Sequence, residues 1–372
     1  MRSITVIYDG SSYTYKWLKA LFWAKKEFYA KGYKIKYLSI FDFLPCKYNE
    51  KLEGIKLFLS LLRKYDIVFL AFHHGISKLG SDATYRKKYL TKLRKHVKYL
   101  YWLDTADSTG TCLFDVIKYV DLYFKKQLLL DTQLYANSMY CGRITSQYYY
   151  EKFGIQDDSF NNKNYDILEE EDIKKLRVAW NIAFYDYVGG TKKVILRPNK
   201  IDFPKVVRND FKDRTIDIHF GGSNYKVYGE NIGYQRKYLL EYIDRLLSKT
   251  HPDVYKKIPR DEYLTELGNS KSIISPFGWG EVCLRDFEAF IFGATLLKPS
   301  MEHLITYPNI YIPNETYIPI NWDFSNLVEV VNNIGSEKYI EIANRGQAEY
   351  IKYCHSEKAR ELFVEHMIHQ FS

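Results

Sequence analysis

The sequence is poor in cysteine, and none of its cysteines form a Cys-x-x-Cys pair. Five are present in 372 residues, an odd number scattered along the chain. A disulfide framework uses an even number of cysteines, and a structural zinc site uses closely spaced pairs. The pattern therefore argues against both and is typical of a reducing cytosol. The five are Cys46, Cys112, Cys141, Cys283 and Cys354.

Long hydrophobic runs are also absent. No apolar run reaches the roughly 18 residues that a membrane-spanning helix needs. The N-terminal segment from Met1 to Gly10 predicts a strand and a turn, and it lacks the apolar core of a signal peptide. We therefore expect a cytoplasmic protein, with peripheral contact to a membrane as a further option.

The sequence contains neither a long basic run nor a known nucleic-acid-binding motif. It carries 54 Lys and Arg residues against 45 Asp and Glu residues, a formal charge of +9. A moderate positive charge favours anionic partners, which include nucleotide diphosphates, anionic membrane surfaces and nucleic acid. The basic stretch Arg86–Lys95 is short, so we expect no nucleic acid; the stretch suits a solvated face or anionic lipid.

What the sequence does contain is typical of a globular α/β protein. Apolar residues make up 46% and charged residues 27%, and 372 residues suffice for about two domains. Short apolar runs alternate with helical stretches, which predicts parallel sheets flanked by helices. A polar stretch, Gln156–Lys175, and the pair Gly189-Gly190 separate two such series. We therefore predict two Rossmann-like domains, residues 1–189 and residues 190–355, with a cleft between them.

One stretch, Ser275–Pro299, has the pattern strand, glycine loop, helix, strand. Pro276, Gly278 and Gly280 interrupt regular structure and let the backbone approach a ligand closely. The following helix is predicted to end at Gly293. A glycine loop that leads into a helix start presents free N–H groups and the positive end of the helix dipole, which suits phosphate.

The motif Pro-Phe-Gly…Glu-Ala-Phe-Ile-Phe-Gly-Ala-Thr-Leu-Leu within this stretch resembles the donor-binding signature of GT-B glycosyltransferases, of the group-one or exostosin-like type. The resemblance implies two Rossmann-like domains facing across a cleft, with a last helix, about 356–372, that packs back on the first domain. It also implies that Glu288 binds the ribose of a nucleotide sugar. Many retaining members carry a second glutamate eight residues earlier, where this chain has Gly280, so retention or inversion stays open.

The same resemblance places glycines and a basic residue after the first strand of the second domain. Arginine suits bidentate contact with phosphate better than lysine does. The predicted donor-binding residues are Gly221, Gly222, Ser223, Arg236, Phe277, Gly278, Trp279, Gly280, Glu281, Arg285 and Glu288.

Three polar residues at the ends of apolar strands are candidates for the catalytic base: His73, Asp104 and Asp107. In a parallel sheet these ends face the ligand-binding edge, and an inverting glycosyltransferase needs a base for the acceptor hydroxyl. Either aspartate suits the cap of a following helix equally well. No ligand spacing indicates a metal site, and the resemblance implies neither a catalytic metal nor a cofactor.

The sequence thus predicts a metal-independent glycosyltransferase that moves a sugar, a hexose or a related one, from a nucleotide-sugar donor to a glycan or lipid-linked acceptor. Synthesis of surface polysaccharide or another glycoconjugate is the expected setting. Two alternatives stay open, another phosphate-binding α/β enzyme and a basic nucleic-acid-binding protein.

Overall fold

The structure is a computed structural model that describes residues 1–39, 66–73, 78–157, 166–185, 200–207, 211–220, 225–246 and 258–371. We call residues 1–185 the first half and residues 200–371 the second half. The predicted glycines at 189 and 190 lie outside the described residues, as do the predicted donor-binding residues Gly221, Gly222 and Ser223. The predicted domain boundary at residue 189 therefore stays a prediction.

The first half is built on a sheet of six parallel strands in the order β2-β1-β3-β4-β5-β7. Strand β3 is buried along its whole length, as expected for a parallel sheet covered on both faces. Helix α1 begins after Ser11, whose hydroxyl accepts the N–H of Thr14. The strands are β1 Arg2–Tyr8, β2 Tyr33–Ser39, β3 Ile67–Ala71, β4 Tyr99–Asp104, β5 Leu122–Lys125 and β7 Leu176–Val178, and the helices are α1 Ser12–Trp23, α2 Lys25–Ala30, α5 Lys78–Ser81, α6 Ala83–Leu93, α7 Ile144–Phe153 and α8 Glu170–Ile173.

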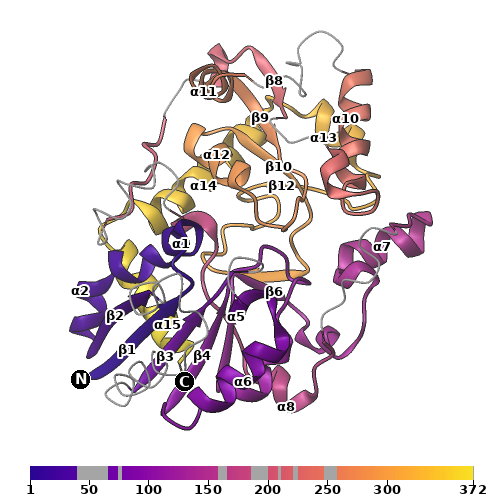
Figure 1. Cartoon of the computed structure of the whole chain (residues 1–372). Coiled ribbons are helices and arrows are strands. Elements are labelled where there is room, and N and C mark those ends of the chain that lie inside the picture. Colours follow the sequence, from indigo (N-terminus) through magenta and orange to yellow (C-terminus); the bar gives the residue numbers. More distant parts are fainter. Residues whose placement is uncertain are drawn as a thin grey trace.

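The second half is built on a parallel sheet of four strands in the order β12-β10-β9-β8. Figure 1 shows this sheet and its helices above the first sheet, with the ends of both sheets turned toward each other. The strands are β8 Ile216–His219, β9 Ser270–Ile274, β10 Thr295–Pro299 and β12 Ile318–Ile320, and the helices are α10 Tyr234–Leu246, α11 Arg260–Gly268, α12 Leu284–Phe292, α13 Leu327–Asn332, α14 Glu337–Cys354 and α15 Ala359–His369.

These two sheets confirm the predicted fold class, an α/β protein with two Rossmann-like halves. None of the described helices is long and apolar enough to cross a membrane. Short 3₁₀ helices occupy several connections between strands and helices. The 3₁₀ segments are Phe114–Tyr119, Thr132–Ala136, Tyr140–Gly142, Ile182–Phe184, Phe211–Asp213 and Tyr225–Tyr228.

Three elements cross from one half to the other. Strand β11, Leu304–Thr306, pairs with β6, Gln127–Leu129, as a small antiparallel sheet. Helix α7 places Tyr149 in the hydrophobic cluster of the second sheet. Helix α15 lies over the first sheet (Figure 1), where the ring of Phe371 contacts rings on β3, β4 and β5.

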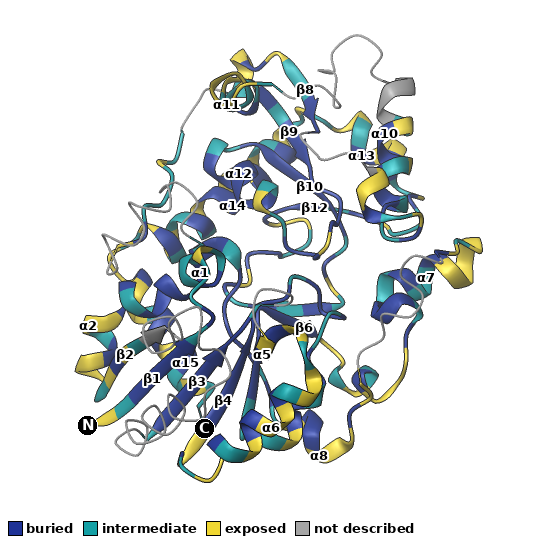
Figure 2. Ribbon diagram, viewed as in Figure 1, coloured by how far each residue is buried: buried dark blue, intermediate teal, exposed yellow. Residues whose placement is uncertain are grey.

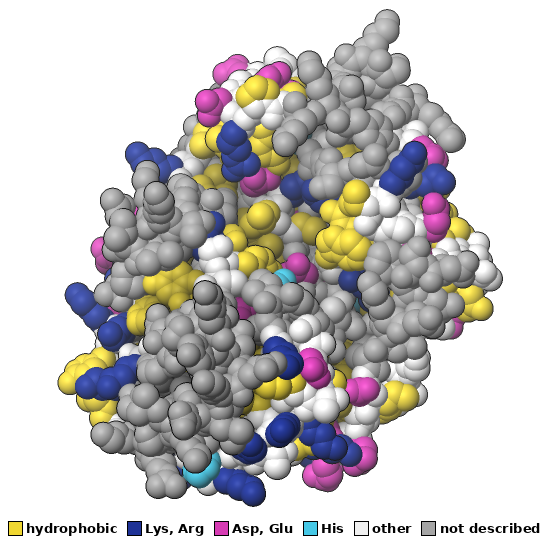
Figure 3. Space-filling view, in the orientation of Figure 1, with side chains coloured by type: hydrophobic (Ala, Val, Ile, Leu, Met, Phe, Trp, Pro, Cys, Tyr) yellow, Lys and Arg dark blue, Asp and Glu magenta, His cyan; other side chains and the backbone are white. Residues whose placement is uncertain are grey.

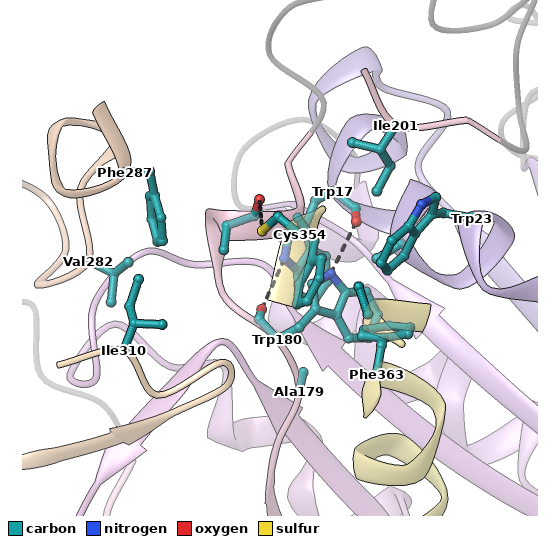
Figure 4. Close-up of a cluster of buried hydrophobic side chains, with 14 of the residues drawn as sticks. Trp17, Trp23, Ala179, Trp180, Ile201, Val282, Phe287, Ile310, Cys354 and Phe363 are labelled. Carbon is teal, nitrogen blue, oxygen red and sulfur yellow. Dashed lines mark hydrogen bonds between the residues drawn. The ribbon is translucent and has the colours of Figure 1, made fainter. Parts of the chain in front are cut away.

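A single hydrophobic cluster also joins the halves. Trp17 and Trp180 stack with their ring centroids 4.4 Å apart, and each indole N–H donates to the other residue's carbonyl oxygen at 3.2 Å. Figure 4 shows this pair beside Phe363 of α15, with Val282 and Phe287 of the second half in the same cluster. Figure 2 shows that the strands of both sheets are buried, and the cluster contains residues of both halves, so the two halves share part of one core.

Candidate functional site

The segment between β9 and α12 has the conformation that the sequence predicts, a loop that leads into a helix. Cys283 stands at the N-cap of α12, and its N–H donates to the carboxylate of Asp286 at 2.9 Å. Gly293 ends the helix with φ +62°, a left-handed conformation that glycine adopts readily. We call residues 275–283 the glycine loop.

A pocket of about 300 Å³ lies between the two halves, beside the glycine loop. Figure 3 shows a hollow between the halves, with hydrophobic, basic and acidic side chains at its edges. The lining of the pocket includes four aromatic rings and two arginines, a combination that suits a ligand with both apolar and anionic parts. The first half contributes Tyr13, Asp107, Ile182 and Tyr185, and the second half contributes Tyr228, Arg236, Gly278, Trp279, Gly280, Val282, Cys283, Leu284 and Arg285.

Two guanidinium groups form the cationic part of this lining. Arg236 is only 2% exposed; its Nε–H donates to the carbonyl oxygen of Phe277 at 2.8 Å, and its guanidinium lies 4.5 Å from the ring centroid of Tyr228. Within the described part of the chain, its Nη1 has no hydrogen-bond partner. Burial, together with the neighbouring charge of Arg285, lowers the pKa of Arg236 to about 10. An anion between the two arginines would relieve both effects.

The first half contributes a carboxylate to the same pocket. The side chain of Asp107 is 44% exposed, and its Oδ1 accepts from Nζ of Lys126 at 2.8 Å and from the hydroxyl of Tyr13 at 3.0 Å. Burial raises the pKa of Asp107, but the charge of Lys126 and these two hydrogen bonds outweigh it, so the pKa lies below its ordinary value. Asp107 is therefore ionised at neutral pH.

His73, the second candidate base, lies behind this carboxylate. Its ring centroid is 4.5 Å from that of Tyr13, and its Nδ1 is 3.0 Å from the hydroxyl oxygen of Thr105. Its charge contributes to the lowered pKa of Asp107. His73 does not line the pocket, so of the two it is Asp107 that a ligand there would meet.

Asp104, the third candidate, is enclosed within the first half. It is 1% exposed and accepts from the hydroxyl of Tyr123 at 2.5 Å, from Nζ of Lys125 at 3.1 Å and from the N–H of Ala106 at 2.8 Å. The bond from Ala106 closes a turn after β4, and Asp104 does not cap a helix, since the next helical segment, Phe114–Tyr119, has Leu113 at its N-cap. The main partner of Asp104 is Lys125, with which it forms a buried ion pair. Asp104 does not line the pocket.

Glu288, to which the resemblance assigns the ribose, lies on α12 outside the pocket lining. Its carboxylate accepts from the hydroxyl of Tyr263 at 2.6 Å and from Nη1 of Arg260 at 3.4 Å, both on α11. In this arrangement Glu288 ties α12 to α11, and the ribose-binding role stays a prediction.

The glycine loop itself divides into two sets of residues. Gly278, Trp279 and Gly280 line the pocket, as predicted for a loop that approaches a ligand. Phe277 is absent from this pocket's lining, and Glu281, also absent from it, is 3% exposed and held by side chains and backbone of the first half.

Three residues of this region were not predicted from the sequence: Tyr13, Lys126 and Arg143. Lys126 follows β5 directly, beside Lys125, so a pair of lysines at a strand end was the available signal. Tyr13 lies on α1, and nothing in its local sequence distinguishes it from the many other tyrosines. Arg143 donates to the carbonyl oxygens of Gly278 at 3.3 Å and of Trp279 at 2.8 Å, contacts that only the tertiary structure reveals.

No group of three His, Cys, Asp or Glu side chains within the described residues is placed to hold a metal ion. The arrangement can bind an anion at the two arginines and accept a proton at Asp107. These are the two abilities that the lining offers.

No protein-family model and no curated protein matches the sequence. Among solved structures, the chain is similar to an alpha-glucosyltransferase (AGT) in complex with UDP, at 12% identity and a TM-score of 0.46, with 100% of both chains covered. It is also similar to HepE from Anabaena in complex with UDP, at 10% identity and a TM-score of 0.45, covering 100% of this chain and 99% of that one. At such values, the reaction has to be inferred from the chain's own site.

Proposed function

We propose that this protein is a glycosyltransferase that uses a nucleotide-sugar donor. The observation that carries the proposal is the pocket between the halves, with two guanidinium groups on the second-half side and an ionised, partly exposed carboxylate on the first-half side. A nucleotide sugar has a diphosphate that needs cations, and its acceptor has a hydroxyl that needs a base.

The donor diphosphate binds at Arg236 and Arg285, next to the start of α12. Arginine makes bidentate contacts with phosphate oxygens, and the N-terminal end of a helix adds free N–H groups and a favourable dipole. The same groups stabilise the negative charge that develops on the leaving nucleoside diphosphate. Because these cations neutralise the diphosphate, the proposed reaction proceeds without a metal.

Asp107 acts as the base. As the acceptor oxygen forms its bond to the anomeric carbon, the bond from that carbon to the phosphate oxygen breaks, and the hydroxyl proton passes to Asp107. Lys126 and Tyr13 hold the carboxylate in place on one oxygen. The second oxygen, Oδ2, has no hydrogen-bond partner among the described residues and is the one free to receive the proton.

The sugar, the acceptor, the location and the domain roles are proposed from the sequence analysis. The transferred group is a hexose or a related sugar, and the acceptor is a glycan or a lipid-linked sugar in surface polysaccharide or glycoconjugate synthesis. The reaction takes place in the cytoplasm, with peripheral membrane contact as an option. Residues 1–189 form the acceptor domain and residues 190–355 the donor domain.

A ligand screen followed by one substitution tests the proposal. We expect one class among UDP, GDP, CMP and dTDP sugars to raise the melting temperature, since a ligand at 100 times its Kd stabilises by about 2.7 kcal/mol. Asp107→Asn should keep donor binding and lose roughly 100-fold or more in release of nucleoside diphosphate.

Asp323→Asn is the matched control, because Asp323 is an acid whose ion pair with Lys152 lies outside the pocket lining. It should turn over at the wild-type rate. The proposal is wrong if no nucleotide sugar stabilises the protein, or if Asp107→Asn and Asp323→Asn are equally active.

A further inference from the structure

The side chain of Glu281 leaves the glycine loop and enters the first half. Its Oε1 accepts from the hydroxyl of Thr109 at 2.8 Å and from the hydroxyl of Ser108 at 3.2 Å. Its Oε2 accepts from the N–H of Thr109 at 3.0 Å and from the side-chain amide of Gln127 at 3.2 Å. The donors are separated from Glu281 by more than 150 residues of chain, so each bond joins one half to the other.

The carboxylate is charged in spite of its burial. Burial raises the pKa of Glu281, but its pairing with His303, the charge of Arg143 and the hydrogen bonds with Thr109 outweigh it, and the pKa lies below its ordinary value. Because burial also lowers the pKa of His303 to about 4, Arg143 and Thr109 are the partners that hold the carboxylate charged at neutral pH. Hydrogen bonds to a charged group are roughly twice as strong as those between neutral groups. A buried carboxylate with this set of donors therefore holds its two sides firmly together.

Two further contacts act on the same loop. Arg143 of the first half donates to two carbonyl oxygens of the loop, those of Gly278 and Trp279. Gly280 lies so close to the first half that an added Cβ would be 2.0 Å from the carbonyl oxygen of Asp107. The backbone of the loop thus rests directly on the residue that carries the proposed base.

We propose that Glu281 is a positioning residue, which locks the glycine loop onto segment 107–109 and so sets the place of the donor-binding arginines relative to Asp107. This inference rests on the proposed function. On each side of the contact, the bonded residues are close in sequence to a functional residue. Asp107 immediately precedes Ser108 and Thr109, and Glu281 lies four residues before Arg285. A shift of the loop therefore moves the two functional groups apart.

The experiment has to distinguish a positioning role of Glu281 from direct contact with the donor. A residue that touches the donor changes the donor Kd, whereas a residue that aligns donor and base changes kcat at saturating donor. Misplacement by about 1 Å costs on the order of 100-fold in rate. We expect Glu281→Gln to lower kcat by roughly 10- to 100-fold while the nucleotide Kd changes by less than about threefold.

Amide hydrogen exchange gives a readout that needs no activity. The Thr109 N–H donates to Glu281, so in Glu281→Ala its exchange should accelerate by about tenfold or more, because local opening then exposes it.

Thr109→Val, which keeps the shape of the side chain and removes its hydroxyl, should also lower kcat, by a smaller factor than Glu281→Gln does. Arg143→Lys loosens the loop from a second point and should also lower kcat with little change in Kd.

Lys152→Met is the control. The Lys152–Asp323 pair also joins the two halves, through helix α7, but neither residue belongs to the glycine loop. It should show wild-type kcat and wild-type exchange at Thr109. Unchanged exchange of the Thr109 N–H in Glu281→Ala would contradict the proposal that Glu281 holds the glycine loop on segment 107–109. A tenfold rise in nucleotide Kd at unchanged kcat would show instead that Glu281 acts on the donor. If the wild-type protein binds no nucleotide sugar, the proposed function fails, and the exchange data still report on the contact between the halves.

Discussion

Replacing Arg236 by methionine should separate ligand binding from stability. Methionine is close to arginine in length and apolar, so it keeps the packing against Tyr228 and removes the charge. Among the described residues the guanidinium makes one hydrogen bond, to the carbonyl oxygen of Phe277. It also lies over the ring of Tyr228 and beside the like charge of Arg285. The substitution therefore removes two favourable interactions, the hydrogen bond and the cation–π contact, and one unfavourable interaction.

These contributions to stability partly cancel. Loss of the hydrogen bond costs about 1 kcal/mol and loss of the cation–π contact about 0.5–2 kcal/mol. Removal of a neighbouring like charge gains on the order of 1 kcal/mol at the dielectric of a partly buried site. The free energy of unfolding should therefore fall by less than about 2 kcal/mol in the absence of ligand.

Affinity should change far more. A hydrogen bond to a charged group contributes about 1.5–3 kcal/mol, which corresponds to a rise in nucleotide Kd of roughly 10- to 150-fold. Isothermal titration calorimetry with the nucleotide found in the ligand screen gives the Kd, and urea unfolding gives the stability. Arg345→Met is the control, because Arg345 pairs within α14 and does not line the pocket. Unchanged Kd in Arg236→Met would refute the anion site, and a loss of more than about 3 kcal/mol in stability would show that Arg236 is a structural residue.

Three further substitutions test the surroundings of the site. Lys126→Met removes the cation that lowers the pKa of Asp107; the pKa then rises, so the acidic limb of the pH profile of kcat/KM should move to higher pH, and an unmoved limb would exclude Asp107 as the base. Gly280→Ala places a Cβ 2.0 Å from the carbonyl oxygen of Asp107 and should destabilise by about 1–3 kcal/mol in urea unfolding, whereas a neutral effect would mean that the halves do not meet there. Glu288→Gln separates two roles of Glu288: the ribose-binding role predicts a roughly tenfold loss of nucleotide affinity in calorimetry, whereas a role limited to the bond with Tyr263 predicts a loss of about 1 kcal/mol of stability with an unchanged nucleotide Kd.

The local part of the site is the part that sequence predicts well. Pro276, Gly278 and Gly280 mark the loop, and Gly293 marks the helix end, because these conformations depend on the residues themselves. The order of strands and helices follows in the same way from the alternation of apolar and polar runs. Two Rossmann-like halves could therefore be predicted without any knowledge of contacts.

The choice between neighbouring candidates could not be predicted. Asp104 is the last residue of β4 and Asp107 comes three residues later, and their tertiary partners distinguish them: Asp104 pairs with Lys125 inside the sheet, and Asp107 pairs with Lys126 at the pocket. Adjacent lysines at a strand end point in different directions, and their targets are about 20 residues away. The sequence likewise placed Glu281 with the donor, because its partners on segment 107–109 become neighbours only when the halves meet.

The crossing of α15 onto the first sheet has a consequence for synthesis of the chain. Phe371 and its neighbours cover rings on β3, β4 and β5, so these strands lack part of their cover until the whole second half has been translated. At about 5–20 residues per second, that delay is roughly ten to forty seconds. We expect the nascent first half to expose these aromatic rings during that time, because the residues that cover them belong to the other half. The final packing of the first sheet thus waits for translation of the end of the described chain.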